Sequence, residues 1–313
     1  MVSNPKLKQT IDALISQEAL PDTYADTVEQ TILPLAEHIL NKQRRIGKTV
    51  LVGIHGAQGT GKSTLTLFLQ EILGKHFQCP TASFSLDDIY LTRADRAELA
   101  QRIHPLFQTR GVPGTHDMEL GRRVIADLRK AQAGDQTPIP VFDKSIDDRV
   151  PEAQWPSFQG AASVILLEGW CVGARPEPEV ALAQSINELE RTEDAEGIWR
   201  RTVNESLEEA YRHLFDDMDS LVMLKAPSMD SVREWRTLQE HKLADKVKSA
   251  PKESDGSALA PSLRIMSDAE VHWFIMHYER VTRACLGEMP ARADVLIEVA
   301  EDHSLGLPRF KTK

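Results

Sequence analysis

The sequence predicts an α/β fold: a parallel sheet of about five strands, covered by helices on both faces. Three observations lead to this prediction. Short apolar runs suited to buried strands alternate with stretches of helical character along the chain. The first run, 49–55, leads directly into a glycine-rich loop and then into a helix. Later runs end in acidic residues, at the strand ends where ligands bind in sheets of this kind.

The N-terminal part, up to residue 46, is predicted to be largely helical and to break near Pro21. An apolar stripe with helical spacing, from Ile32 to Leu40, gives it one face to bury. We therefore expect 1–46 to form a helical appendage packed on the core, and 47–313 to form a single domain.

The glycine-rich loop, 56–63, matches G-x-x-x-x-G-K-[ST] at every fixed position. Glycines let backbone N–H groups turn inward around a phosphate, and the helix that follows adds partial positive charge. Lys62 is expected to reach the β and γ phosphates of a nucleotide, and the Ser63 hydroxyl to bind Mg²⁺. Gly74 is the expected end of the helix. The residues expected to contact ATP here are Gly56, Ala57, Gln58, Gly59, Thr60, Gly61, Lys62, Ser63 and Thr64.

Four further strands are expected at 81–86, 163–167, 220–224 and 294–299. Between the first two of these, helices are predicted at 92–103, with Thr92 as N-cap, and at 118–131. Residues 175–217 are predicted to be mainly helical. A long helix at about 228–246, a polar tract at 248–261 and a helix from Ser267, with a capping box to Glu270, complete the chain. Residues 228–262 are the expected lid.

Composition limits the function. The chain has 313 residues, 41% of them hydrophobic and 27% charged, which is ordinary for a globular protein. Its net charge of −10 lacks the basic footprint of nucleic-acid binding, so we expect no nucleic-acid partner. No apolar run approaches membrane-spanning length, and the N-terminus lacks the apolar core of a signal peptide. Three widely spaced cysteines fit a reducing, cytoplasmic setting. The oligomeric state is left open.

The acidic strand ends predict the chemistry. Asp87 and Asp88 follow the second strand and Glu168 follows the third, so all three should meet at the edge that carries the phosphate loop. A phosphoryl-transfer site needs a phosphate cradle, a carboxylate near Mg²⁺ and an acid that orients the attacking hydroxyl. Glu168, or Asp88, is expected to complete the Mg²⁺ shell beside Ser63.

Basic residues supply the candidate anion contacts. Arg233 and Arg236 share a helix face and are candidates to cover the γ-phosphate from the lid, although surface ion pairing explains them equally well. A second cluster, Asp143, Lys144 and Arg149, suits an anionic substrate or an ordinary charged loop. His116 and Asp117 are candidates for substrate binding or for capping the next helix.

Several motifs together resemble the D-glycerate 3-kinase family, the plant and fungal type with its proteobacterial relatives. That family belongs to the P-loop kinases near phosphoribulokinase, uridine kinase and pantothenate kinase. The matching stretches run in the family's order from about residue 49 to 300. They are the phosphate loop, S-L-D-D-I-Y at 85–90, G-T-H-D at 114–117, D-K-S at 143–145, E-G-W at 168–170, W-R at 235–236 and H-Y-E-R at 277–280. One departure is a short connection, Ile146-Asp147, between D-K-S and the following D-R.

The resemblance implies an ATP- and Mg²⁺-dependent kinase of P-loop NTPase fold that phosphorylates a hydroxyl of D-glycerate. It makes Asp87 the catalytic base, supported by Lys62 and Arg236. Lys144 and Arg149 are expected to hold the substrate carboxylate. The full substrate-binding set expected is Asp88, Tyr90, His116, Asp117, Asp143, Lys144 and Arg149. The alternatives are a kinase for a nucleoside, a pantothenate-like acid or a sugar phosphate, a nucleotide-switched binding protein, and an inactive scaffold.

Overall fold

The computed structural model describes residues 4–249 and 265–311, with side chains omitted at 246–249. The predicted polar tract at 248–261 and the far end of the expected lid therefore lie mostly outside the described residues. In chain order the strands of the main sheet are β1 Val50–Gly56, β2 Thr81–Ser85, β7 Val164–Gly169, β8 Ser220–Lys225, β9 Val295–Glu298 and β10 Arg309–Phe310. Two small hairpin-like sheets pair β3 Gln136–Pro138 with β6 Ser157–Gln159, and β4 Phe142–Asp143 with β5 Asp148–Arg149.

The main sheet has the order β10-β9-β8-β1-β7-β2. The five strands expected from the sequence all form and run parallel, so the phosphate loop after β1 leaves the middle of the sheet. The sixth strand, β10, was not expected: it pairs antiparallel with β9 over only two residues. Its exposed side chains carry no burial pattern that would indicate a strand.

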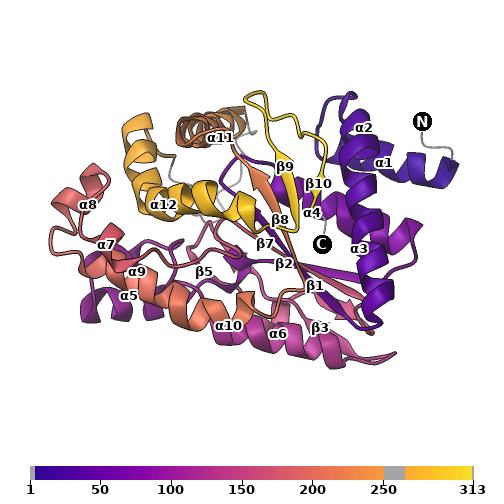
Figure 1. Cartoon of the computed structure of the whole chain (residues 1–313), viewed down its shortest axis with the longest axis horizontal. Helices are drawn as coiled ribbons and strands as arrows, with labels where there is room; N and C mark the ends of the chain where they lie inside the picture. The colour runs from indigo at the N-terminus through magenta and orange to yellow at the C-terminus, as the bar shows by residue number, and fades with distance from the viewer. Residues whose placement is uncertain (1–3, 250–264, 312–313) are drawn as a thin grey trace, which may run out of the picture.

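Helices cover both faces of the sheet (Figure 1). In chain order they are α1 Pro5–Gln17, α2 Tyr24–Thr27, α3 Leu33–Ile46, α4 Lys62–Glu71, α5 Arg93–Arg102, α6 Met118–Lys130, α7 Glu179–Leu182, α8 Glu188–Thr192, α9 Ile198–Ser206, α10 Arg212–Phe215, α11 Met229–Ser249 and α12 Asp268–Glu288. One core lies between the sheet and α1, α3 and α4, and the other lies between the sheet and α6, α9 and α10. Neighbouring β1 residues alternate between the two, as a doubly covered strand requires: Leu51 faces one core and Val52 the other.

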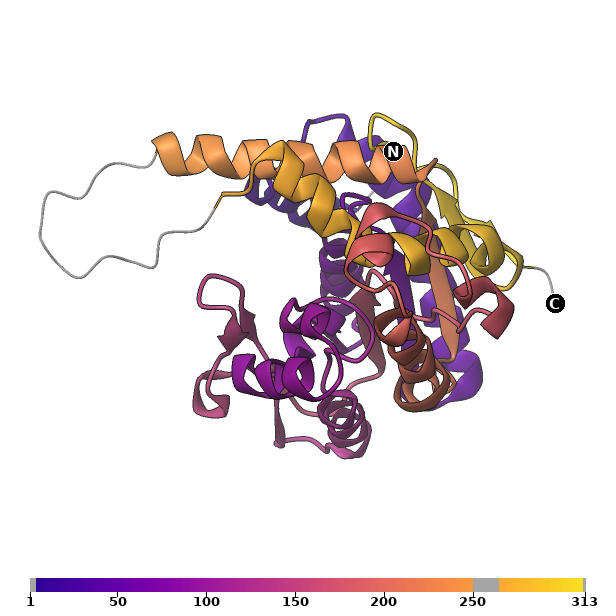
Figure 2. The same ribbon diagram turned by 90° about the vertical axis from the view of Figure 1, so that its left-hand side faces the viewer.

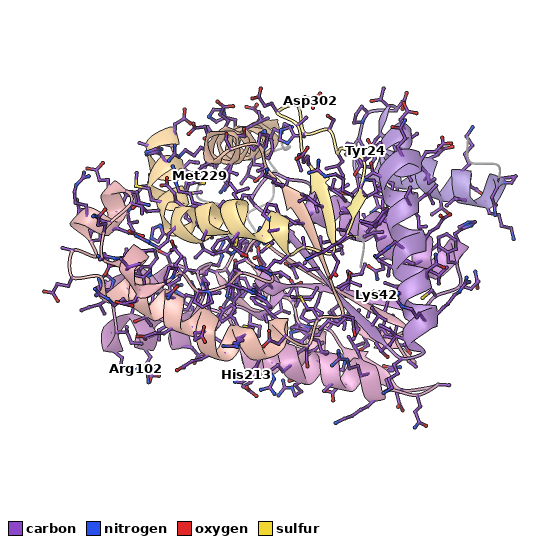
Figure 3. The ribbon with its side chains drawn as sticks, viewed as in Figure 1. Tyr24, Lys42, Arg102, His213, Met229 and Asp302 are labelled. Atoms are coloured by element: carbon purple, nitrogen blue, oxygen red, sulfur yellow. The ribbon has the colours of Figure 1, made fainter. Side chains whose placement is uncertain are left out.

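The N-terminal helices pack directly against this sheet. Their apolar stripe, which includes Ile32, Leu35 and Ile39, is buried in the same core as β1 and α4. Tyr24 of α2 contacts Phe68 of α4 with ring centroids 5.3 Å apart; Tyr24 is labelled in Figure 3. The expected break near Pro21 is present, between α1 and α2.

One helix end differs from the prediction. Gly74 does not stop the helix that follows the phosphate loop: the chain continues from α4 through a π-helical turn at Ile72–His76. Ile72 and Leu73 are fully buried there. Their burial outweighs the ~1 kcal/mol that glycine costs inside a helix.

The two long helices α11 and α12 lie side by side over the carboxyl edge of the sheet, as Figure 2 shows. The predicted capping box starts α12: Ser267 accepts from the Glu270 N–H, and Glu270 bonds back to the Ser267 N–H. The Thr92 cap of α5 is also present, with Asp95 as its partner. These local signals fix where the elements around the site begin.

Candidate functional site

The phosphate loop has the shape its sequence requires. Gly59 and Gly61 adopt left-handed backbone angles, with φ of 84° and 80°, which glycine tolerates without strain. The Thr60 hydroxyl donates to the Ala57 carbonyl at 2.8 Å and closes the loop on itself. The N-cap residue of α4 is Gly61, which has no side chain to cap the helix, so the N–H groups of the first turn are available to phosphate oxygens.

Asp87 lies where β2 ends, in a short 3-10 turn that Ser85 caps. Its two carboxylate oxygens accept from the Tyr90 hydroxyl at 2.8 Å and from the Lys144 ammonium at 2.6 Å. Burial would raise the pKa of Asp87, but the charges of Lys144 and Lys62 and the two hydrogen bonds outweigh it and lower the pKa to about 2. Asp87 is therefore a carboxylate at neutral pH.

Asp88, the next residue, has the opposite shift. Burial raises its pKa, the Ser85 N–H bonded to it at 2.8 Å works against the rise, and the charges of Asp87 and Glu168 add to it, so that the pKa reaches about 6. Two adjacent carboxyl groups thus have well-separated pKa values, which is typical of functional sites.

Glu168 and Ser63 form the candidate Mg²⁺ site. The Ser63 hydroxyl donates to Glu168 Oε1 at 3.0 Å. Glu168 Oε2 is buried and has no hydrogen-bond partner among residues 4–249 and 265–311. Among the described residues, no group of three or more His, Cys, Asp or Glu is placed to hold a metal alone. One carboxylate with a hydroxyl nevertheless fits Mg²⁺, which binds few protein ligands and takes its others from water and phosphate.

The helices α11 and α12 form the opposite wall. Arg236 pairs with Glu240 at 2.8 Å and lies over the Phe274 ring, 5.7 Å from its centroid. Trp235 packs directly against Gly59, so a β-carbon added at Gly59 would lie 2.5 Å from the Trp235 side chain. The phosphate loop and α11 are therefore in contact.

These parts enclose one cleft of about 470 Å³. Its lining residues come from the phosphate loop, the strand ends and the two helices, and they are Gln58, Gly59, Lys62, Ser63, Ser85, Asp87, Asp88, Tyr90, Arg110, Lys144, Glu168, Trp170, Arg236, Gln239, Glu240, Leu243, Phe274 and Tyr278. The structure thus brings together the expected base, phosphate-binding lysine, metal-binding pair and lid arginine.

Other expected site residues do not line this cleft. Arg149 pairs with Asp117 at 3.2 Å and donates to the Tyr90 carbonyl, while Asp117 also caps α6. His116 is buried, stacks on Tyr90 and bonds to Tyr211; burial lowers its pKa to about 3. Asp143 accepts from Ser145 in the turn that follows β4. Contact between these residues and a substrate stays a prediction.

Arg233 also lies outside the cleft lining. It pairs with Asp230 at 2.7 Å and with Glu279 at 2.8 Å. Its contact with a nucleotide stays a prediction, whereas the surface ion pairing considered as the alternative is present.

The cleft contains residues that received no role from the sequence. Arg110 and Tyr278 are the main ones: the Tyr278 hydroxyl donates to the Arg110 carbonyl at 3.0 Å. Tyr278 and Trp170, whose rings meet edge to face, both belong to stretches that carry the family resemblance. That membership was the only signal that pointed to them.

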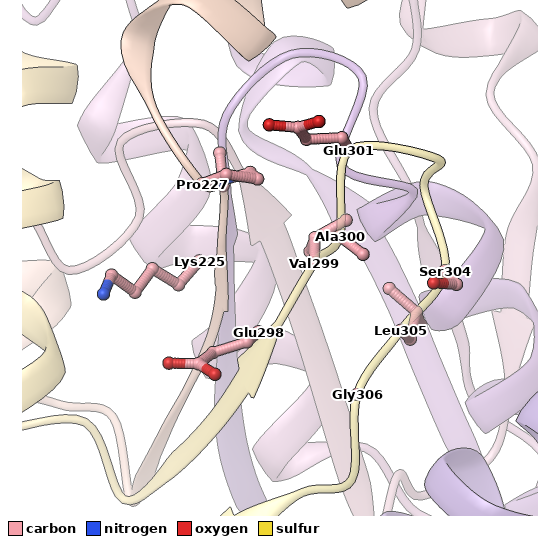
Figure 4. A pocket seen from close by; sticks show the side chains of 10 residues that line it. Lys225, Pro227, Glu298, Val299, Ala300, Glu301, Ser304, Leu305 and Gly306 are labelled. Carbon is pink, nitrogen blue, oxygen red and sulfur yellow. The ribbon is translucent and has the colours of Figure 1, made fainter.

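A second hollow, of about 550 Å³, lies beyond the phosphate loop at the ends of β8 and β9 (Figure 4). Lys225 and Pro227 line it from the end of β8, and 298–301 and 304–306 line it from the end of β9. His303 bonds to the Gly59 carbonyl at 3.0 Å, and Trp235 donates to the Glu301 carbonyl at 3.1 Å. These hydrogen bonds connect the walls of the hollow to the phosphate loop and to α11. The hollow lies on the side of the loop opposite Asp87.

Comparisons with known proteins identify kinases among the relatives of this chain. No family model matches the sequence. The chain is 34% identical over 241 residues to an uncharacterized kinase, mug58, of Schizosaccharomyces pombe, covering 74% of this chain and 79% of the relative. It is 30% identical over 244 residues to chloroplastic D-glycerate 3-kinase of Arabidopsis thaliana, covering 76% of this chain and 48% of that protein, so it spans about half the plant protein's length.

Solved structures share the fold. The D-glycerate 3-kinase of Cryptococcus neoformans matches with a TM-score of 0.71 at 23% identity, covering 90% of this chain and 99% of that one. At this identity the likeness concerns the fold alone.

Proposed function

Because the chain belongs to the family of P-loop kinases that includes the D-glycerate 3-kinases, we propose that it transfers the γ-phosphate of ATP to a hydroxyl of D-glycerate, giving 3-phosphoglycerate. The observation that carries the proposal is the meeting of Asp87, Lys62 and the Ser63–Glu168 pair in one cleft. Family membership makes the protein a kinase that phosphorylates an alcohol group. The identity of the acceptor is the proposed part.

Each part of the cleft has a role in this reaction. The acceptor hydroxyl oxygen attacks the γ-phosphorus, the bond from that phosphorus to ADP breaks, and the hydroxyl proton passes to Asp87. A carboxylate oxygen accepts more than one hydrogen bond. Asp87 can therefore accept a hydrogen bond from the acceptor hydroxyl and still accept those from Tyr90 and Lys144. With a pKa of about 2 Asp87 is a weak base, so its main contribution is to orient the hydroxyl.

The remaining groups act on the phosphates. The loop N–H groups and Lys62 hold the β and γ phosphates, and Arg236 faces them from α11. Ser63 and Glu168 would hold Mg²⁺, which neutralises charge on the phosphate oxygens. The residues proposed to bind the acceptor lie on the side of the phosphate loop that carries β7 and β2. The second hollow lies on the other side, with β8 and β9, and is left for the adenine and ribose of ATP.

The proposed location is the cytoplasm. The three cysteines, Cys79, Cys171 and Cys285, are buried and unpaired, which suits a reducing compartment. Among the described helices, none is long and apolar enough to cross a bilayer.

The test is a panel of acceptors with γ-labelled ATP: D-glycerate, glycerol, pantothenate, uridine and a pentose phosphate. We expect label on D-glycerate. Asp87→Asn should bind ATP normally but lower kcat by about 10²–10⁴-fold, the usual contribution of a positioned acid–base group. Asp127→Asn, an exposed acid on α6, is the matched control and should behave as wild type.

Other outcomes would replace the proposal. Label on uridine or pantothenate alone would identify a different kinase activity. Near-normal turnover in Asp87→Asn would remove its role. Binding of ATP without turnover on any acceptor would indicate a scaffold, and preference for GTP with partner capture would indicate a switch.

A further inference from the structure

Arg110 lies in the loop between α5 and α6 and reaches the cleft that contains Asp87. About a quarter of its side chain is exposed, at 28%. The arginine is therefore accessible from the cleft while most of it is packed.

The backbone at this position is held from three sides. Tyr278 donates to the Arg110 carbonyl at 3.0 Å, Trp170 donates to the Gly111 carbonyl at 2.9 Å, and the Gly111 N–H donates to the Thr115 hydroxyl at 2.9 Å. Gly111 has a φ of 132°, and a β-carbon there would lie 2.1 Å from the Tyr278 hydroxyl. These contacts fix where the Arg110 side chain starts, as a preorganised binding site requires.

The charges around Arg110 do not cancel. Asp147, in the turn between β4 and β5, pairs with both Arg110 and Arg96. Guanidinium groups stay charged in proteins, so two positive charges share one carboxylate. Both guanidinium groups also lie over the Phe142 ring, 5.6 and 5.9 Å from its centroid. The two guanidinium groups therefore carry one positive charge more than the carboxylate they share.

Arg110 is not needed to hold the turn at Asp147 in place, because Arg96 already holds it. Arg96 is 1% exposed, binds the Asp147 carboxylate at 2.9 Å and donates to the Gln108 and Asp147 carbonyls. Arg110 donates to the Asp147 carboxylate through Nη1, and within the part of the chain that the structure describes its Nε and Nη2 donate no hydrogen bond to protein. These groups are free to bind a ligand.

The other basic residues near the proposed acceptor site are already paired with acidic residues that the proposal uses or that lie outside the cleft. Lys144 is bonded to Asp87, and Arg149 lies against Asp117 outside the cleft lining. Arg110 is thus the best-placed cation for an anionic group on the acceptor.

We propose that Arg110 binds the carboxylate of a hydroxy-acid acceptor while Asp87 receives its hydroxyl, so that Arg110 selects acids over neutral alcohols. An arginine fork binds a carboxylate through two parallel hydrogen bonds, which fixes orientation as well as charge. This inference rests on the proposed function for the identity of the acid, D-glycerate.

The test compares Arg110→Gln with Arg102→Gln. Arg102 is an exposed arginine at the end of α5, at the periphery of the molecule in Figure 3. In Arg110→Gln we expect the KM for D-glycerate to rise at least about 30-fold, the effect of losing a charged hydrogen-bonded pair. The KM for ATP should stay within about twofold. Arg102→Gln should match wild type in both.

A neutral analogue adds a second readout. Wild type should prefer D-glycerate to glyceramide, and Arg110→Gln should lose that preference. Arg110→Lys keeps the charge but not the fork, so it should restore part of the D-glycerate affinity while its KM stays at least about fivefold above wild type. Melting temperatures show whether each variant is folded; if Arg110→Gln is not, the Arg110→Lys result decides.

Failure of the inference and failure of the function are distinguishable. Unchanged D-glycerate KM in Arg110→Gln, or in Arg110→Lys, with normal wild-type turnover overturns the inference and leaves the function. Calorimetry with D-glycerate and a non-hydrolysable ATP analogue covers the reverse case: Arg110-dependent binding without turnover keeps the inference and removes the function. Phosphorylation of neutral acceptors alone would overturn both the role of Arg110 and the proposed D-glycerate kinase activity.

Discussion

At the scale of single residues, the adjacent carboxyl groups of Asp87 and Asp88 differ because their neighbours differ. Burial raises the pKa of both groups, but Asp87 has two ammonium groups and a tyrosine hydroxyl around it, whereas the neighbours of Asp88 are chiefly two carboxylates and one backbone N–H. The pKa is lowered in the first case and raised in the second. At neutral pH Asp87 is fully charged, and the charge on Asp88 is costly in the free enzyme.

This difference predicts a pH-dependent gain from Asp88→Asn. A raised pKa means that folded Asp88 binds its proton more tightly than the unfolded chain does, so ionised Asp88 lowers stability above about pH 6 and not below the unfolded value of 3.8. Asn is neutral and still accepts from the Ser85 N–H. The free energy of unfolding should rise by up to about 3 kcal/mol at pH 8 and barely change at pH 4.

Urea unfolding in EDTA without nucleotide measures the effect, since bound Mg²⁺ or phosphate would change the charges around Asp88. Asp127→Asn should show no difference at either pH. A gain of equal size at pH 4 and pH 8 would mean that the charge on Asp88 is not its cause.

The residues at strand ends could be predicted, and those held by distant contacts could not. Parallel strands place their carboxyl ends on one edge, so Asp87, Glu168 and the phosphate loop had to meet. Arg110 reaches the same cleft through a bond to Tyr278, 168 positions away, which no local pattern encodes. For Arg149 the sequence shows a charge but not which side of a hairpin it occupies.

At the scale of elements, α12 packs closely against the loop that carries Arg110, and the contact is made at Gly111, where Tyr278 of α12 leaves no room for a side chain. Gly111→Ala would place a methyl group on the Tyr278 hydroxyl and force a φ of 132° on a residue that avoids it. We expect a loss of about 2–4 kcal/mol in the free energy of unfolding, with a raised acceptor KM because Arg110 is displaced.

Gly134→Ala is the matched control. Gly134 also has a positive φ, of 98°, but a β-carbon there would meet no atom of the described residues within 4 Å. Only backbone strain remains, so the loss should be about 1–2 kcal/mol with unchanged KM values. Equal losses at the two glycines would show that contact with Tyr278 does not limit position 111.

Elements defined by local chemistry were predictable, and those defined by packing were less so. The N-cap at Thr92 and the capping box at Ser267 involve residues at most three apart and appear where expected. The helix after the phosphate loop passes Gly74 because Ile72 and Leu73 are buried by segments far away in the sequence. The two-residue strand β10 depends entirely on its partner β9.

At the scale of the whole molecule, charge is distributed unevenly. The chain carries −10 overall. Eight ionisable residues of fixed sign line the cleft and balance four against four: Lys62, Arg110, Lys144 and Arg236 against Asp87, Asp88, Glu168 and Glu240. A neutral cleft in an acidic protein reduces the repulsion that a triphosphate and a carboxylate substrate would otherwise meet.

The whole-molecule prediction concerns the N-terminal helices. The sequence predicts a helical appendage packed on the core, and Leu35 of α3 is fully buried in the core that also contains β1 and α4, the elements on either side of the phosphate loop. Leu35→Ala should therefore cost about 2–5 kcal/mol in the free energy of unfolding, as buried leucines do. Leu307→Ala, at a side chain 65% exposed, should change it by less than about 0.5 kcal/mol.

Removal of 1–46 extends the same argument. Without α1 and α3, apolar side chains of α4 and the sheet, among them Phe68 and Val52, would lose part of their cover. A sheet that loses the cover of one of its two cores should then lose its cooperative unfolding transition in urea, and ATP binding with it, because the phosphate loop connects β1 to α4. If 47–313 alone unfolds cooperatively with a free energy close to that of the full chain, the domain does not need these helices to fold, and the loss in Leu35→Ala would have to be local.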